Sequence, residues 1–185
     1  YFCSFNDPGR IRKSAARLRS LSAAVLDPGD ASVAACPAVN ERRETKYARD
    51  PAEVSLEEKF ELIQRYNMIL REPASVQTTR AVYQDRRSAS VYMNSEGTRV
   101  LNDRSFCGVS LTSIAKDGTV IQPFGDSVAG YGGFEIAGGR EEMAGRVVRT
   151  AVDLLRAEPV SGGNFDIIVD QKLGGVFIHE AFGHL

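Results

Sequence analysis

The chain has 185 residues, of which 43% are hydrophobic and 25% are charged, and its formal net charge is −1. This profile is typical of a globular domain with one core of ordinary size. The balanced charge excludes a strong attraction to nucleic acid, and no apolar run approaches the ~20 residues of a membrane helix. We therefore expect one domain over residues 1–185, without direct nucleic-acid binding and without a membrane segment.

Three cysteines, Cys3, Cys36 and Cys107, are widely spaced along the chain. An odd number without regular spacing does not indicate a disulfide framework, and none of the three shows the spacing of metal ligands. Free thiols of this kind are typical of a reducing compartment, so we expect a cytoplasmic protein.

The first predicted element is a helix that begins at Asp7-Pro8, a pair that combines a helix cap with a residue favoured in the first turn. One face of this helix carries residues at helical spacing: Ile11, Ala15, Leu18, Ser22 and Val25. The turn residues Asp27-Pro28-Gly29-Asp30 end it. The following segment, 31–51, carries the charges Glu41, Arg42, Arg43 and Glu44, and we interpret it as a solvated loop.

A capping box at Ser55 and Glu58 predicts a second helix, which runs to about Arg71. The hydrophobic period then changes to two, which is typical of strands, with turn signals that end in Gly97 and Gly118. The alternating segments are residues 76–85, 89–94, 99–101, 106–115 and 119–124. Together they predict an antiparallel meander sheet.

A glycine-rich stretch, residues 125–139, lacks the pattern of a phosphate-binding loop and is expected to be a flexible loop or an edge segment. Residues 140–157 predict a third helix with its apolar side chains inward, namely Met143, Val147, Ala151, Leu154 and Leu155. Phe165 to Val169 predict a buried strand, and a last helix begins near Gly174. The order favours an α+β fold with helices on one face of the sheet.

The last helix carries both histidines of the chain, in the motif His179-Glu180-Ala181-Phe182-Gly183-His184. Imidazole nitrogens bind Zn²⁺, and a neighbouring carboxylate that is not a ligand can act as a general base. His179 and His184 are therefore candidate metal ligands and Glu180 a candidate catalytic residue. A short motif of this kind also occurs by chance as inert surface histidines.

The two histidines are separated by five positions, whereas the familiar zinc-peptidase motif separates them by four. On a regular helix, residues at i and i+5 lie about 140° apart around the axis, so both rings cannot face one ion. Either a π-bulge absorbs the additional residue, or Gly183 ends the helix in the left-handed region and returns His184 toward the site. The sequence leaves both solutions open.

The segment Gly174 to His184 resembles the active-site helix of the TldD/PmbA family of zinc metallopeptidases, also known as modulators of DNA gyrase. The match is to the TldD-type subunit, because the PmbA-type (TldE) paralogue lacks the HExxxH motif. Three further segments resemble family landmarks: Asn94 to Gly97, Gly132 to Glu135 and Pro159 to Asp170.

The resemblance implies Zn²⁺ bound by His179 and His184, with Glu180 as the general base in peptide hydrolysis. It implies peptides or unfolded proteins as substrates, and a homodimer or a heterodimer with a TldE/PmbA-like subunit. It also implies a longer protein, with an earlier N-terminal segment and a C-terminal domain whose cysteine is the third zinc ligand. We therefore expect 1–185 to be a truncated N-terminal domain that is inactive by itself.

Two other functions remain open from the sequence. The chain could be a non-catalytic interaction or dimerisation module, or an inactive fragment, in which the sheet surface matters and no zinc is bound. A nucleic-acid-binding regulator would require a basic face, which the net charge of −1 does not favour.

Overall fold

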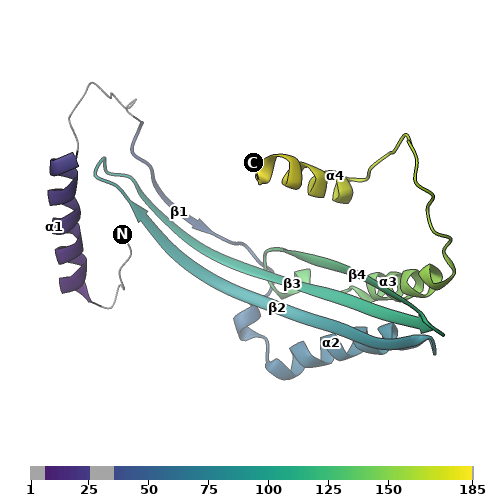
Figure 1. Cartoon of the computed structure of the whole chain (residues 1–185). Coiled ribbons are helices and arrows are strands. Elements are labelled where there is room, and N and C mark those ends of the chain that lie inside the picture. Colours follow the sequence, from purple (N-terminus) through teal and green to yellow (C-terminus); the bar gives the residue numbers. More distant parts are fainter. Residues whose placement is uncertain (1–6, 26–35, 185) are drawn as a thin grey trace. The chain divides into compact units, whose positions relative to one another are not determined.

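The computed structural model describes residues 7–25 and 36–184, which belong to two compact units. One unit consists of Tyr1–Glu41 and Tyr92–Val100, and the other of Arg42–Val91 and Leu101–Leu185. The helices are α1 (Pro8–Val25), α2 (Leu56–Leu70), α3 (Glu141–Asp153) and α4 (Gln171–Ile178), and the strands are β1 (Asn40–Glu44), β2 (Val76–Met93), β3 (Arg99–Asp117) and β4 (Val120–Tyr131) (Figure 1). No helix within the described ranges is long and apolar enough to cross a membrane.

Helix α1 confirms the predicted first element. The Asp7 carboxylate accepts a hydrogen bond from the Arg10 N–H at 3.0 Å, as expected of a cap. Its predicted apolar face is not buried, since Ala15 is exposed and Leu18 keeps 46% of its surface in solvent. The predicted end of this helix, and Cys3, lie outside the described residues.

Strand β3 is the centre of the four-stranded sheet and pairs with β1, β2 and β4. Strands β3 and β4 are antiparallel, with a register that runs from Phe106 opposite Tyr131 to Asp117 opposite Val120. Gly118 lies in the connecting turn with φ of +55°, and Gly97 lies in the β2–β3 turn with φ of +90°. Both predicted turns are therefore confirmed. Glycine suits these two positions because it adopts a positive φ without a steric penalty.

The sheet is mixed, so the prediction of a purely antiparallel meander was wrong. The Arg99 N–H donates to the Val39 carbonyl at 2.7 Å, and the Thr45 N–H donates to the Asp103 carbonyl at 3.0 Å. The partners advance in the same direction on both strands, which makes β1 parallel to β3. Strand β1 lies inside the predicted loop 31–51, and all five of its residues are exposed. A strand whose side chains are all exposed has no hydrophobic alternation for sequence reasoning to detect.

Three further strand predictions changed. The segments 99–101 and 106–115 form one strand, β3. The segments 76–85 and 89–94 form one strand, β2. The exposed Arg87 lies between them and binds Asp103 of β3 at 2.8 Å instead of ending the strand. Phe165 to Val169 form no strand, and Ile168 is fully exposed. This segment has the composition of a buried strand, but a strand needs a neighbouring edge, and it pairs with none of the described strands.

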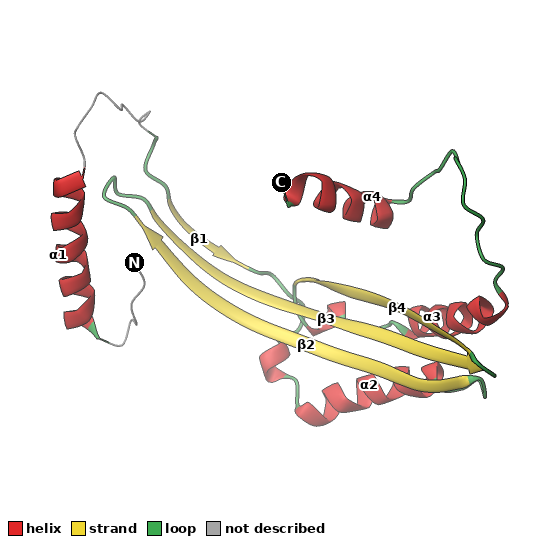
Figure 2. Ribbon diagram, in the orientation of Figure 1, coloured by secondary structure: helices red, strands yellow, loops and turns green. Residues whose placement is uncertain are grey.

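Helices α2 and α3 pack on one face of the sheet, as predicted (Figure 2). Alternate residues of β3, namely Cys107, Val109 and Leu111, point toward these helices, as the period of two requires. The core comprises Leu62, Tyr66 and Leu70 from α2, Cys107, Val109 and Leu111 from β3, and Met143, Ala144, Val147 and Val148 from α3. The capping box is confirmed in part, since the Ser55 hydroxyl accepts from the Glu58 N–H at 3.1 Å. Strand β4 occupies the first half of the glycine-rich stretch.

Tyr66 joins the helical layer to the turn before α3, and its side chain is fully buried. Its hydroxyl donates to the Ala137 carbonyl at 2.7 Å and accepts from the Arg140 N–H at 3.2 Å. We expect Tyr66→Phe to lower the free energy of unfolding by about 1–3 kcal/mol, because two backbone groups lose their partner. Urea unfolding measures the change. The control Tyr92→Phe removes the hydroxyl of an exposed side chain and should change stability by less than about 0.5 kcal/mol. Equal losses of unfolding free energy in both variants would contradict the stabilising role of the Tyr66 hydroxyl.

Candidate metal centre

Helix α4 leads directly into the motif and begins three residues before the predicted start near Gly174. Asp170 is its cap: the carboxylate accepts from the Leu173 N–H at 2.8 Å, and its carbonyl accepts from the Gly174 N–H at 2.8 Å. Two glycines, Gly174 and Gly175, disfavour a helix on their own, so a cap that satisfies the free N–H groups helps to define the start.

The α-helix changes to a π-helix over His179–Gly183. A π-helix bonds residue i to residue i+5, so positions five apart come onto one face. The wider turn absorbs the additional residue between the histidines, and the π-bulge prediction is confirmed. The alternative was wrong: the glycines with positive φ in the described residues are Gly97, Gly118 and Gly139, and Gly183 is not among them.

The π turn brings the two imidazoles together. Their Nε2 atoms lie 2.9 Å apart, the ring centroids are 4.5 Å apart, and the ring planes meet at 81°. His179, Glu180 and His184 each offer a donor atom, and these atoms all lie within 4.8 Å of one another. The three sequence-predicted site residues therefore form one cluster in the structure.

This donor set fits a zinc ion. Two nitrogens bound tetrahedrally at 2.0–2.1 Å from zinc would lie about 3.3 Å apart, so the observed separation needs only a small opening of the pair. Nitrogen and carboxylate oxygen are both ligand types that zinc accepts. All three side chains are exposed, as is required for a ligand or a substrate to reach them.

Gly183 makes room for the first histidine. A Cβ at this position would lie 3.3 Å from His179 Nδ1, which is closer than ordinary van der Waals contact. Glycine at 183 thus leaves space for the close approach of the ring, and its backbone angle is not unusual. Sequence reasoning identified the residue as part of a π-bulge or of a left-handed helix end and left both roles open.

The surface around the motif is apolar and open. None of the residues 158–184 is buried. Large apolar side chains on α4 and the π turn are between 54% and 70% exposed: Leu173, Val176, Phe177, Ile178 and Phe182. Burial within the described residues therefore does not hold this helix in place.

A charged cluster that sequence reasoning missed links α4 to the sheet. Asp126 of β4 is only 12% exposed; Lys172 of α4 donates to its Oδ1 at 2.6 Å, and Arg146 of α3 donates to its Oδ2 at 2.7 Å. Burial opposes ionisation of Asp126, but the hydrogen bonds from Lys172, Arg146 and the Ser127 N–H outweigh it and lower the pKa to about 2. We call Asp126, Arg146 and Lys172 the Asp126 cluster. No sequence signal points to it, because its members are 20 and 46 positions apart.

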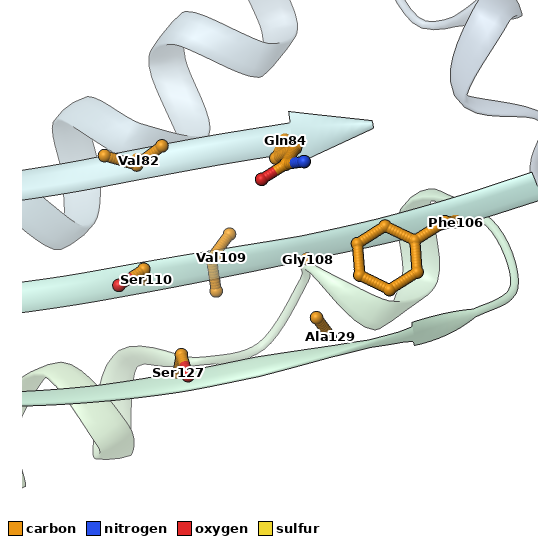
Figure 3. A pocket seen from close by; sticks show the side chains of 8 residues that line it. All are labelled: Val82, Gln84, Phe106, Gly108, Val109, Ser110, Ser127 and Ala129. Atoms are coloured by element: carbon orange, nitrogen blue, oxygen red, sulfur yellow. The ribbon is translucent and has the colours of Figure 1, made fainter. Parts of the chain in front are cut away.

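A shallow groove of about 240 Å³ lies on the sheet and does not contain the motif (Figure 3). Its lining comes from three strands: Val82, Gln84, Phe106, Gly108, Val109, Ser110, Ser127 and Ala129. None of these side chains titrates near neutral pH, so the groove offers no acid, base or metal ligand of the kind that His179, Glu180 and His184 provide.

The family model and the relatives that match this chain are described as metallopeptidases or metalloproteases. The family model described as the PmbA/TldA metallopeptidase central domain matches residues 49–157. A metalloprotease of Methanothermobacter thermautotrophicus is 34% identical over 185 residues, covering 99% of this chain and 40% of the relative. A metalloprotease of Synechocystis is 28% identical over 189 residues, again with 40% of the relative covered. The chain thus spans about two fifths of the length of these relatives.

A solved structure shares the fold. It is a Thermotoga maritima protein described as a candidate modulator of a DNA gyrase, with a TM-score of 0.55 and 17% identity. The alignment covers 72% of this chain and 31% of that protein. At this level of identity the likeness concerns the fold alone. The region matched by the family model ends before the motif, so the cluster of His179, Glu180 and His184 rests on its own geometry.

Proposed function

The chain belongs to the PmbA/TldD metallopeptidase family, and we propose that in the intact protein it contributes a zinc centre that hydrolyses peptide bonds, with His179 and His184 as metal ligands and Glu180 as the general base. The observation that carries the proposal is the π turn, which places two imidazole Nε2 atoms 2.9 Å apart beside a carboxylate. A regular helix would separate these side chains.

In this proposal His179 and His184 are neutral ligands, and Glu180 moves the protons. Zinc, when bound, would supply Lewis-acid polarisation of the scissile carbonyl and activation of water. Glu180 accepts a proton from the attacking water as the new C–O bond forms. The same carboxyl group then gives that proton to the amine nitrogen as the C–N bond breaks, so the residue returns to its ionised state.

The proposed substrates are peptides or unfolded proteins, which can present an extended backbone to an exposed motif. A homodimer or a heterodimer with a PmbA-like subunit is proposed as the assembly. The exposed apolar side chains of α4 and the π turn support this assembly. A contiguous apolar surface of this kind is typical of a protein–protein interface.

The role of Gly183 gives a first test of the site. We expect Gly183→Ala to weaken zinc binding about tenfold, since the new methyl group would press on the His179 ring and a supporting contact of a ligand is worth about 10–100-fold. Competition with a chromophoric chelator measures the affinity. The matched control is Gly175→Ala on the same helix, where a Cβ meets nothing within 4 Å and zinc affinity should be unchanged. If both variants bind zinc with the affinity of the wild type, the His179 ring does not depend on the space that Gly183 leaves beside it.

A further inference from the structure

Three elements meet at the Asp126 carboxylate. Strand β4 supplies Asp126, α3 supplies Arg146 and α4 supplies Lys172, with N···O distances of 2.7 Å and 2.6 Å. Each cation binds a different carboxylate oxygen, so the carboxyl group is fixed in rotation. Because only 12% of the Asp126 side chain is exposed, these contacts are less screened by solvent than an ordinary surface pair.

Helix α3 gives this arrangement a rigid base. Its inner side chains, including Met143 and Val147, belong to the hydrophobic core that joins α2, α3 and β3. Arg146 lies between these two buried residues in the sequence, so its backbone is held by the packing on either side. The Asp126 carboxylate is therefore fixed by its own strand and by a helix that is itself fixed.

Helix α4 lacks comparable support. Residues 157–170, which lead into it, are exposed throughout, and its apolar side chains are exposed as well. The contact between Lys172 and Asp126 therefore carries much of the connection between this helix and the sheet. Lys172 lies two helical turns before His179, about 10 Å along the axis. A helix transmits a displacement at its first turn to the residues at its other end.

We propose that Asp126 and Lys172 are positioning residues of the metal centre: their ion pair, supported by Arg146, fixes the helix that presents His179, Glu180 and His184. This proposal rests on the proposed zinc function. It assigns no contact between the Asp126 cluster and the metal or the substrate. Its effect is on the orientation and order of α4.

The test compares Lys172→Met with Lys172→Arg and Asp126→Asn in the intact protein. Lys172→Met and Asp126→Asn remove the ion pair and should weaken zinc binding about tenfold, measured with a competing chromophoric chelator. Both should also accelerate amide hydrogen exchange over residues 171–183. Lys172→Arg keeps the charge and should therefore keep the zinc affinity and the amide exchange rates of the wild type. The Lys172 side chain is 67% exposed, so its variants should fold even if Asp126→Asn does not.

A matched control removes a lysine–aspartate pair elsewhere in the same unit. Lys59 binds Asp85 at 2.7 Å, between α2 and β2, and Lys59→Met should leave zinc affinity and exchange over 171–183 unchanged. If Lys172→Met binds zinc as tightly as Lys59→Met, the positioning role is overturned while the zinc centre stands. If the wild-type protein binds no zinc, the proposed function itself fails, whatever the exchange rates show.

Discussion

Replacing Glu180 by glutamine in the full-length protein is expected to lower the rate of peptide hydrolysis by about 10²–10⁴-fold while zinc remains bound. The amide has nearly the same shape as the carboxylate but cannot accept the proton of the attacking water, and general base catalysis is worth about this much. The side chain is exposed, so the substitution should not disturb the fold. Hydrolysis of a fluorogenic peptide and zinc content measured on the same preparation provide the two readings.

The zinc content of the variant shows whether Glu180 is a general base or a ligand. Both roles are open to it, because a Glu180 oxygen lies close enough to both imidazoles to bind the same ion. Loss of zinc together with activity would make Glu180 a ligand or a residue that orients one. Glu158→Gln makes the same chemical change at an exposed position outside the motif and should alter neither reading. A Glu180→Gln variant that retains full activity would remove this residue from the mechanism.

Replacing His184 by alanine is expected to abolish stoichiometric zinc binding, with a loss of affinity greater than about 100-fold. Residues that only support a ligand are worth about 10–100-fold, so the removal of a ligand should exceed that range. One remaining histidine leaves the ion with too few protein ligands for a catalytic zinc site, which normally has three. Metal content after dialysis against a weak chelator measures the effect.

His184→Cys distinguishes lost ligation from a damaged helix. Cysteine is also a zinc ligand, so this variant should retain part of the affinity that alanine loses. Circular dichroism should be alike for all three proteins, because His184 is exposed and follows the last π-helical residue. Zinc content equal to that of the wild type in His184→Ala would favour the non-catalytic interaction module over the zinc peptidase.

The sequence alone was sufficient where local chemistry decides the structure. The capping residue Ser55 located α2, and the glycines at 97 and 118 located two turns, because caps and positive φ angles depend on a few adjacent residues. The five-residue spacing of the histidines required a distorted helix, and a π turn is present. The identity of the candidate ligands likewise needed no coordinates, since both histidines lie in one short motif.

Only the tertiary structure decided which distant segments pair. Strand β1 is held by backbone bonds to β3 about 59 residues away, and its own charged side chains carry no sign of this. Phe165 to Val169 have the composition of a buried strand and yet remain exposed, because pairing depends on an available edge as well as on the segment itself. The Asp126 cluster has the same origin: a largely buried carboxylate attracts cations through space, and the chain brings Arg146 and Lys172 to it only after the sheet and its helices have packed.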